Sequence, residues 1–332
     1  MYSLFVGIDV SKADVHVAIC IDGKSQFIDE FSNDHDGFQE MIKSIRHRSD
    51  IPQDKWFICF ENTGVYSKTL LEYLISRQIL CREENALKVS KSMGFRRGKD
   101  DKIDAQDLSL YAYRHRDSLE PTELAPVAIR RLKKLLSRRE LLVKHRKALE
   151  VSLKDQHLDY ESRLYEQMIQ SNQDIIALYK RQIRDIENLI AQTINETPEL
   201  KTNDRLIQSI KGIGPIISAY LIAYTDNFKS FENARKFACY CGIAPFPNRS
   251  GSSIKGKSKV SPMANKKIKG VLTNGAKSAI AFDKQIRIYY LRKRAEGKQY
   301  GTVINAVKNK MIQRVYAVVK RQSPYVELGT YI

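Results

Sequence analysis

Apolar residues alternate with polar ones, or run together, in three short segments at the start of the chain. These segments span residues 4–9, 15–21 and 26–31, and short polar stretches separate them. Such runs are typical of β-strands, and Asp22-Gly23 between the second and third is a hairpin signal. The pattern predicts an antiparallel meander of three strands.

The next segments alternate between helical and strand patterns. Helical spacing of apolar residues predicts helices over 36–46 and 65–76, and apolar runs predict strands over 55–61 and 79–82. A turn over residues 62–64 joins the fourth strand to the second helix. An antiparallel meander followed by a β-α-β unit is the strand order of a ribonuclease-H-like fold. That order places the fourth strand beside the first.

From about Val127 the apolar residues recur at helical spacing among many charges. Two long helices are predicted, with a break near residues 157–160 and an end at Thr197-Pro198. Long charged helices with one narrow apolar stripe usually pack against something else. We therefore expect an antiparallel hairpin or an intermolecular coiled coil, and self-association as a dimer or tetramer.

A third pattern begins near Asp204, where two apolar helical stretches flank Gly212-Ile213-Gly214. The glycines permit a tight turn, and a helix that starts after such a turn offers its N-terminal amides to a phosphate. This arrangement resembles the helix-hairpin-helix element of DNA-repair and recombination proteins. A plain glycine break between two helices is the alternative.

Charge changes the picture of this last region. The chain contains 56 Lys and Arg against 38 Asp and Glu, a formal net charge of +18, which favours nucleic acid as a partner. The cations, Lys308 among them, concentrate between residues 249 and 321, where Asp283 and Glu296 are the only acids. The candidate nucleic-acid contacts are Lys211, Gly212, Gly214, Arg249, Lys255, Lys257, Lys259, Lys266 and Lys267.

Composition also bounds the core and the compartment. With 332 residues and 42% hydrophobic content, the chain can bury two or three cores. No apolar run approaches the roughly 20 residues of a spanning helix, and the N-terminus lacks the basic stretch of a signal peptide. The five cysteines lack paired metal-ligand spacing and indicate reduced core residues. We expect a cytoplasmic protein that binds no membrane.

Four carboxylates lie where the predicted elements converge. Asp9 ends the first strand pattern and Glu61 the fourth, and Asp101 and Asp104 share one face of a predicted helix. Oxygen ligands from separate elements suit Mg²⁺ or Mn²⁺ better than Zn²⁺, and a pair of such ions supports phosphodiester chemistry. The alternative is that these carboxylates cap turns and line a solvated helix face.

A second candidate lies in the basic loop predicted over residues 247–256. Ser250 is followed by Gly251, and a serine beside glycine can approach a phosphate closely while neighbouring cations stabilise the developing charge. No histidine is nearby to act as a base, which argues against a hydrolase triad. The same composition is ordinary for a linker, so this signal alone leaves both interpretations open.

Several motifs, taken in order, resemble those of one family. They are Gly7-Ile-Asp-Val-Ser-Lys12, Phe60-Glu-Asn-Thr-Gly-Val-Tyr66, Lys99-Asp-Asp-Lys-Ile-Asp-Ala105, Gly212-Ile-Gly214, and Gly242-Ile-Ala-Pro245 followed by Ser250-Gly-Ser-Ser253. The chain resembles the DEDD transposases of insertion elements, which are bridge-RNA-guided recombinases related to pilin-gene invertases. The resemblance extends over nearly the whole chain, and the joint order is more specific than any single motif.

The resemblance implies an α/β plus α architecture in three parts. A RuvC-like domain with the ribonuclease-H fold occupies residues 1–120, and a coiled-coil segment occupies residues 121–200. A mainly helical C-terminal transposase domain with the helix-hairpin-helix element and the serine loop occupies residues 201–332.

The resemblance also implies a chemistry. Asp9, Glu61, Asp101 and Asp104 are the residues expected to bind Mg²⁺, with Mn²⁺ as a substitute, and Ser250 is expected to attack donor and target DNA. The attack forms a 5′-phosphoserine link and releases a 3′-hydroxyl, which conserves the phosphodiester energy for strand exchange. A structured guide RNA, the bridge RNA, is the further partner that the family implies.

Two departures and two rival functions stand beside this interpretation. Asp100 precedes Asp101, so Asp100 and the nearby Asp107 are possible substitutes within their cluster. Residues 247–249 also replace the charged or aromatic residues often seen before the serine. One rival is a catalytically inactive protein that bridges nucleic acids. The other is a metal-dependent nuclease of the Holliday-junction type, in which water attacks instead of Ser250.

Overall fold

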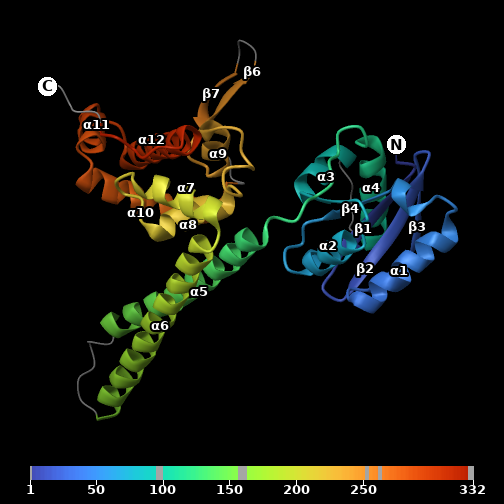
Figure 1. Ribbon diagram of the computed structural model, residues 1–332, viewed down its shortest axis with the longest axis horizontal. Coiled ribbons are helices and arrows are strands. Elements are labelled where there is room, and N and C mark those ends of the chain that lie inside the picture. The colour runs from blue at the N-terminus through green and yellow to red at the C-terminus, as the bar shows by residue number, and fades with distance from the viewer. Residues whose placement is uncertain (1, 95–99, 156–162, 251–253, 261–263, 328–332) are drawn as a thin grey trace. The chain divides into compact units, whose positions relative to one another are not determined.

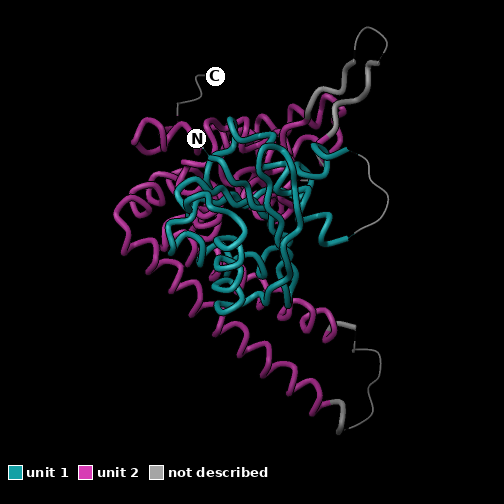
Figure 2. The backbone as a smooth tube through the Cα atoms, turned by 90° about the vertical axis from the view of Figure 1, so that its right-hand side faces the viewer, with its two compact units in different colours: residues 1–124 teal, residues 125–332 magenta. Residues whose placement is uncertain are grey.

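The protein forms two compact units, residues 1–124 and 125–332 (Figures 1 and 2). The computed structural model describes the backbone of residues 2–94, 100–155, 163–250, 254–260 and 264–327. Side chains of residues 154–165 and 246–259 lie outside the description.

Unit 1 is a five-stranded mixed sheet with helices on both faces. Its elements in chain order are β1 (Leu4–Val10), β2 (Asp14–Ile21), β3 (Lys24–Ser32), α1 (His35–Arg48), the short 3₁₀ helix η1 (Gln53–Lys55), β4 (Trp56–Glu61), α2 (Tyr66–Ser76), β5 (Cys81–Glu84), α3 (Ala86–Met93) and α4 (Asp101–Arg114). The strand order is β3-β2-β1-β4-β5. Strands β1, β2 and β3 are antiparallel neighbours, whereas β4 and β5 run parallel to β1. The predicted meander, and the predicted pairing of the first strand with the fourth, are confirmed.

The central strands β1 and β4 are apolar because both of their faces are covered. On one face, α1 and α2 contribute Phe38, Met41 and Leu70 to the core, and on the other α4 contributes Leu108. Every residue of β1 is buried except Asp9, which is half-buried. The sheet therefore presents one polar side chain at the carboxyl end of its central strand.

Helix α4 packs unusually close to β1 because Gly7 has no side chain. A Cβ atom at Gly7 would overlap the backbone of Ala105 and Ser109 in α4. The Ser25 hydroxyl on β3 also lies 2.6 Å from the Ser109 hydroxyl, so α4 is tied to the sheet at the same level. This packing holds the first turn of α4 beside the end of β1.

The last strand of the sheet differs from the prediction. It covers Cys81–Glu84 instead of residues 79–82, because the amide of Ile79 bonds to the Leu74 carbonyl and still closes α2. The chain then turns at Asn85, whose side chain caps α3, a helix that the apolar pattern did not predict. The strand is thus mainly polar, and it ends in two glutamates.

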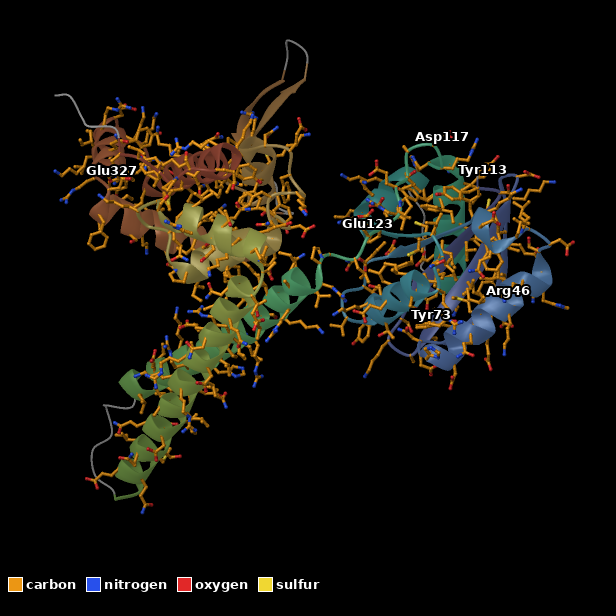
Figure 3. All side chains as sticks on the ribbon, viewed as in Figure 1. Arg46, Tyr73, Tyr113, Asp117, Glu123 and Glu327 are labelled. Atoms are coloured by element: carbon orange, nitrogen blue, oxygen red, sulfur yellow. The ribbon has the colours of Figure 1, made fainter. Side chains whose placement is uncertain are left out.

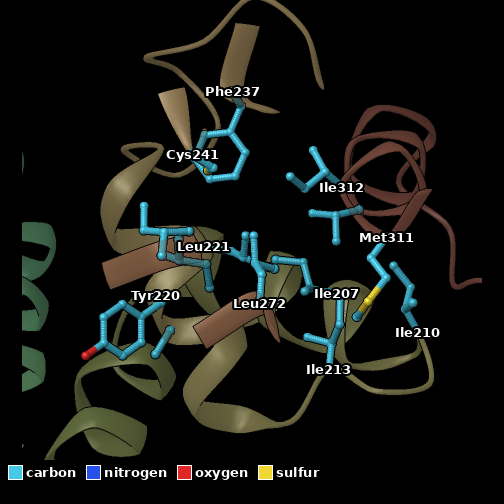
Figure 4. Packing of buried hydrophobic residues seen from close by; sticks show 14 of the residues in the cluster. Ile207, Ile210, Ile213, Tyr220, Leu221, Phe237, Cys241, Leu272, Met311 and Ile312 are labelled. Atoms are coloured by element: carbon cyan, nitrogen blue, oxygen red, sulfur yellow. The ribbon is translucent and has the colours of Figure 1, made fainter. Parts of the chain in front are cut away.

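Unit 2 is mainly helical. Its elements are α5 (Val127–Asp155), α6 (Arg163–Asn195), α7 (Pro198–Gln208), α8 (Pro215–Tyr224), α9 (Ala234–Tyr240), β6 (Phe246–Ser250), β7 (Ile254–Lys259), α10 (Lys266–Phe282), α11 (Lys284–Ala295) and α12 (Tyr300–Arg321). One apolar core joins α7 to α10 and α12, with Ile207, Leu272 and Met311 at its centre (Figure 4). The segment predicted as a loop contains the antiparallel pair β6 and β7.

The two long helices lie side by side and run in opposite directions (Figure 1). Arg131 of α5 forms an ion pair with Glu196 of α6, and Arg139 forms one with Glu187 at 2.7 Å. As the position on α5 rises, its partner on α6 falls, which is the register of an antiparallel hairpin. A coiled coil between copies of the chain stays a prediction.

The glycine turn between α7 and α8 also has a packing reason. Gly212 has φ of +91°, and a Cβ atom there would meet the carbonyl of Gly275 and the backbone of Ala279 in α10. Gly214 is the N-cap of α8, and a Cβ atom there would meet nothing. Gly212 therefore allows α10 to approach, and a contact of this turn with phosphate stays a prediction.

The five cysteines form no disulfide. All five are free, and four of them, Cys20, Cys59, Cys81 and Cys241, are buried. Across the described parts of the chain, no helix has the length and apolar character needed to cross a membrane.

The close contact at Gly7 yields the first prediction. We expect Gly7→Ala to lower the free energy of unfolding of unit 1 by about 3 kcal/mol, because a methyl group would press against helix backbone that cannot rotate away. The only tryptophan, Trp56, is buried in unit 1, so its fluorescence during urea unfolding reports this unit alone.

Gly64→Ala is the matched control. A Cβ atom at Gly64 would meet nothing. The only cost is the strain of an alanine at a φ of +76°, which is about 1 kcal/mol. Equal losses for the two variants would contradict the close packing of α4 on β1.

Candidate active site

Asp9 and Glu61 lie at the carboxyl ends of two neighbouring parallel strands. Ile8 pairs with Phe60, one residue before each carboxylate. Since side chains alternate along a strand, Asp9 lies on the same face as Phe5, the face that α4 covers. Both carboxylates therefore belong to one edge of the sheet, beside the start of α4.

The first turn of α4 supplies the other two carboxylates. Asp100 is the N-cap, and its side chain accepts a hydrogen bond from the Lys102 amide at 2.9 Å. Asp101 and Asp104 follow in the first turn, where the positive end of the helix dipole favours negative charge. Asp107 lies one turn further along α4 and is buried.

Three of the predicted ligands converge. Carboxylate oxygens of Asp9, Asp101 and Asp104 lie within 4.8 Å of one another. Opposite ligands of one Mg²⁺ are about 4.2 Å apart at its usual bond length of about 2.1 Å, so this spacing is close to that of a metal site. The donor set consists of oxygen only, which fits Mg²⁺ or Mn²⁺. Among the residues that the structure describes, Glu61 is outside this group.

Sequence reasoning missed a buried glutamate next to Glu61. Glu84 is the register partner of Glu61 on β5 and is only 3% exposed. Burial alone would raise the pKa of Glu84, but the Asn85 amide and the cations of Arg82 and Lys88 outweigh it and hold the pKa below its ordinary value. The only signal was a pair of glutamates directly after an apolar run.

Glu84 links the edge strand to the site helix. Its carboxylate accepts a hydrogen bond from the Tyr111 hydroxyl of α4 at 3.3 Å, and burial together with Glu84 raises the pKa of Tyr111 to about 12. The tyrosine therefore stays a hydrogen-bond donor at neutral pH. Glu84 and Gly7 hold α4 from two strands.

Ser250 is the last residue of β6, and its backbone pairs with that of Ile254. Arg249 pairs in the same way with Lys255. The side chains of Ser250, Arg249, Lys255, Lys257 and Lys259 lie outside the described residues. The structure thus places these predicted site residues on a two-stranded hairpin and leaves their contacts as predictions.

The remaining predicted nucleic-acid contacts lie at the surface of unit 2. Lys211 forms an ion pair at 2.6 Å with Glu327, which Figure 3 labels, and Lys267 forms one at 2.9 Å with Glu140. Lys266 is exposed. Exposed ion pairs contribute little to stability, so a phosphate can replace the carboxylate at low cost.

An open groove of about 540 Å³ extends this basic surface along α5. Its lining combines Lys267 of α10 with Lys134, Arg138 and Lys144 of α5. These α5 cations were not among the predicted nucleic-acid contacts, because the charged long helices were interpreted only as a packing and self-association element. The groove is a candidate for contact with a nucleic-acid backbone.

The structure corrects the prediction that Lys308 belongs to the exposed basic surface. It lies on α12, is only 3% exposed, and donates a hydrogen bond to the Asn305 side chain at 3.3 Å. Burial, with a smaller contribution from Lys269, lowers the pKa of Lys308 to about 8. The prediction of an exposed cation was wrong here, because Lys308 occupies an inward position of an amphipathic helix.

Two transposase families match consecutive parts of the chain. Residues 6–160 match the family model of DEDD transposases of the IS110 type, and residues 204–291 match that of the IS116/IS110/IS902 transposases. The first match contains the four predicted carboxylates, and the second contains Ser250.

The chain is also similar over nearly its full length to curated proteins. The pilin gene-inverting protein of Moraxella bovis is 27% identical over 332 residues, with 98% of each chain covered, and that of Moraxella lacunata shows the same identity and coverage. An uncharacterised protein of insertion element IS116 from Streptomyces clavuligerus is 21% identical over 385 residues, which cover 96% of this chain and 94% of that protein.

The carboxylate cluster predicts a metal-dependent stability. We expect Mg²⁺ or Mn²⁺ to raise the free energy of unfolding of unit 1 by about 2.7 kcal/mol at a hundredfold excess over Kd. Asp104→Asn should remove this gain, because it takes one negative charge from the cluster. Thermal unfolding followed by Trp56 fluorescence, with and without metal, measures the difference.

Asp100→Asn is the control for this experiment. Asparagine caps helices as well as aspartate does, so the fold is kept, and Asp100 already bonds to the Lys102 amide. An equal loss of the metal response in Asp100→Asn would contradict the assignment of Asp104, and not Asp100, as the metal ligand.

Lys308 predicts a dependence of stability on pH. Its pKa is about 8 in the folded state against 10.5 ordinarily, so between these values the unfolded state binds more protons. Stability therefore rises as pH rises from about 8 to 10.5. Lys308→Met should remove this rise and stabilise unit 2 at pH 7 by up to about 3 kcal/mol. Circular dichroism melts across this pH range test it, and an unchanged pH slope would refute it.

Proposed function

The chain belongs to the IS116/IS110/IS902 transposase family of DNA recombinases, and on this premise we propose that a carboxylate quartet holds the divalent ions at which DNA strands are cut and rejoined. The quartet is Asp9, Glu61, Asp101 and Asp104. The observation that carries the proposal is the convergence of Asp9, Asp101 and Asp104 within 4.8 Å at the edge of the sheet.

The ions that fit this donor set are Mg²⁺ and Mn²⁺. When bound, they would help to activate the attacking oxygen and neutralise charge on the leaving oxygen. The protein's own part is to hold several carboxylates close together despite their repulsion. It does so with rigid elements, since Asp9 lies on a central strand and α4 is packed against that strand at Gly7.

Ser250 is the proposed nucleophile. As its Oγ bonds to the scissile phosphorus, the serine loses its hydroxyl proton and the bond from phosphorus to the 3′-oxygen breaks. The 3′-oxygen takes up a proton and leaves as a 3′-hydroxyl, while the 5′-phosphate stays on the serine. A 3′-hydroxyl of another strand reverses the step, so no external energy is needed. The family resemblance and the basic hairpin around Ser250 support this assignment.

The remaining parts of the proposal concern partners and organisation. Donor and target DNA are the substrates, a structured bridge RNA guides their choice, and the chain acts as a dimer or tetramer. The coiled coil over residues 121–200 and the helix-hairpin-helix in residues 201–332 belong to the same proposal. The relatives named as pilin gene-inverting proteins support it, because inversion and insertion both require strand exchange.

The serine mechanism predicts a covalent intermediate. We expect Ser250→Ala to abolish protein attached to DNA, seen as a shifted band on a denaturing gel, and to lower strand exchange at least a thousandfold. The substrate is a plasmid that carries the parent insertion element with its flanks. Nucleic-acid binding should be unchanged, since alanine removes only the attacking oxygen.

Ser252→Ala is the matched control, because it removes a hydroxyl two residues away in the same Ser250-Gly-Ser-Ser253 motif. It should keep the covalent product. Cleavage that persists in Ser250→Ala without any covalent product would favour attack by water and contradict the serine mechanism.

A further inference from the structure

Exposed apolar side chains of unit 1 concentrate at the edge that carries the carboxylates. Among the large apolar residues described in this unit, five are exposed: Val65 (81%), Tyr66 (43%), Leu80 (38%), Leu87 (47%) and Ile103 (41%). Four of them follow the carboxyl end of a parallel strand or lie on the first turn of α4, and Leu80 alone precedes β5. Val65, Tyr66, Leu87 and Ile103 are called here the apolar rim.

The rim residues lie close to the predicted metal ligands along the chain. Val65 and Tyr66 follow Glu61 after one turn, and Ile103 lies between Asp101 and Asp104. The Asn33 side chain donates to the Tyr66 carbonyl at 3.3 Å and to the Ser11 carbonyl at 2.8 Å. The start of α2 is therefore anchored to the loop that follows Asp9.

This exposure does not serve the fold. Apolar side chains stabilise a protein only when they leave water, and scattered exposure is ordinary whereas a concentration at one site marks an interaction surface. The cores of unit 1 lie on the two faces of the sheet, away from its carboxyl edge. Among the described residues of unit 1, none covers the rim, so the rim is a candidate surface for a partner.

The charges at the same edge indicate which partner. Three exposed lysines lie among the rim residues: Lys12 follows β1, Lys88 on α3 pairs with Glu84, and Lys102 next to Ile103 lies 5.2 Å from the centre of the Phe27 ring. Cations suit phosphates, and apolar and aromatic surfaces suit the faces of bases that have left their stack. A protein partner would not require these cations. A nucleic acid would use them, because its phosphates are also attracted to the neighbouring metal site.

We propose that the apolar rim holds unpaired bases beside the phosphate at the carboxylate site, with the Tyr66 ring stacked on one of them. This inference rests on the proposed function, because it places the DNA backbone at the carboxylates. Stacking on an aromatic ring is possible for every base, so the rim is expected to act whatever the target sequence. It would keep the strand open around the bond to be cut.

Photocrosslinking tests this contact directly. The probe is a single-stranded 20-nucleotide oligothymidine with one 5-iodouracil, which crosslinks to an aromatic side chain stacked on it. The full chain is irradiated with the probe in Ca²⁺, and the crosslinked peptide is identified by mass spectrometry. We expect a crosslink at Tyr66, its loss of tenfold or more in Tyr66→Ala, and its recovery in Tyr66→Phe. Leu80→Ala, at the other end of β5, should leave the yield unchanged.

The outcomes separate this inference from the proposed function. A crosslink at Tyr66 that survives Asp9→Asn would keep the stacking rim but contradict phosphate placement by the carboxylates. No crosslink at Tyr66, while the probe crosslinks elsewhere, would overturn the inference and leave the Ser250 mechanism standing. Tyr66→Ala that binds the probe normally but fails to self-associate would assign the rim to a second copy of the chain instead.

Discussion

The close packing of α4 against β1 is the constraint on which the site depends. Gly7 lets the helix backbone approach where any side chain would collide with Ala105 and Ser109. Because this contact lies near the start of α4, it brings Asp101 and Asp104 to the end of the strand that carries Asp9. The site therefore depends on the absence of a side chain at Gly7 as much as on the three carboxylates.

The electrostatics of the molecule divide between its units. The acids converge on a rigid sheet edge in unit 1, where repulsion between them makes a divalent cation the favourable partner. The cations of unit 2 line the α5 groove and the surface of α10, where they suit a phosphate backbone. The proposed function uses this division, since unit 1 would hold metal at a phosphate and unit 2 would hold other parts of the polyanion.

The sequence predicted the strands and long helices well, because their apolar patterns are strong and continuous. Asp9, Asp101 and Asp104 could be placed together because strand order and helical spacing are geometric rules. Glu84 was missed since β5 is a short edge strand with mainly polar residues. In the folded chain the Glu84 carboxylate contacts Tyr111 of α4 and Lys88 of α3. Lys308 was misjudged because one helix position decides whether a lysine points inward. The contacts of Ser250 could be predicted only from family resemblance.

The central claim is that the convergent carboxylates bind divalent metal, and anomalous X-ray scattering from crystals of the full chain with Mn²⁺ tests it most directly. The account predicts a manganese peak at the carboxyl edge of the sheet, within bonding distance of Asp9, Asp101 and Asp104. Saturating Mn²⁺ that gives no peak at this edge, or a peak only at other residues, would contradict it.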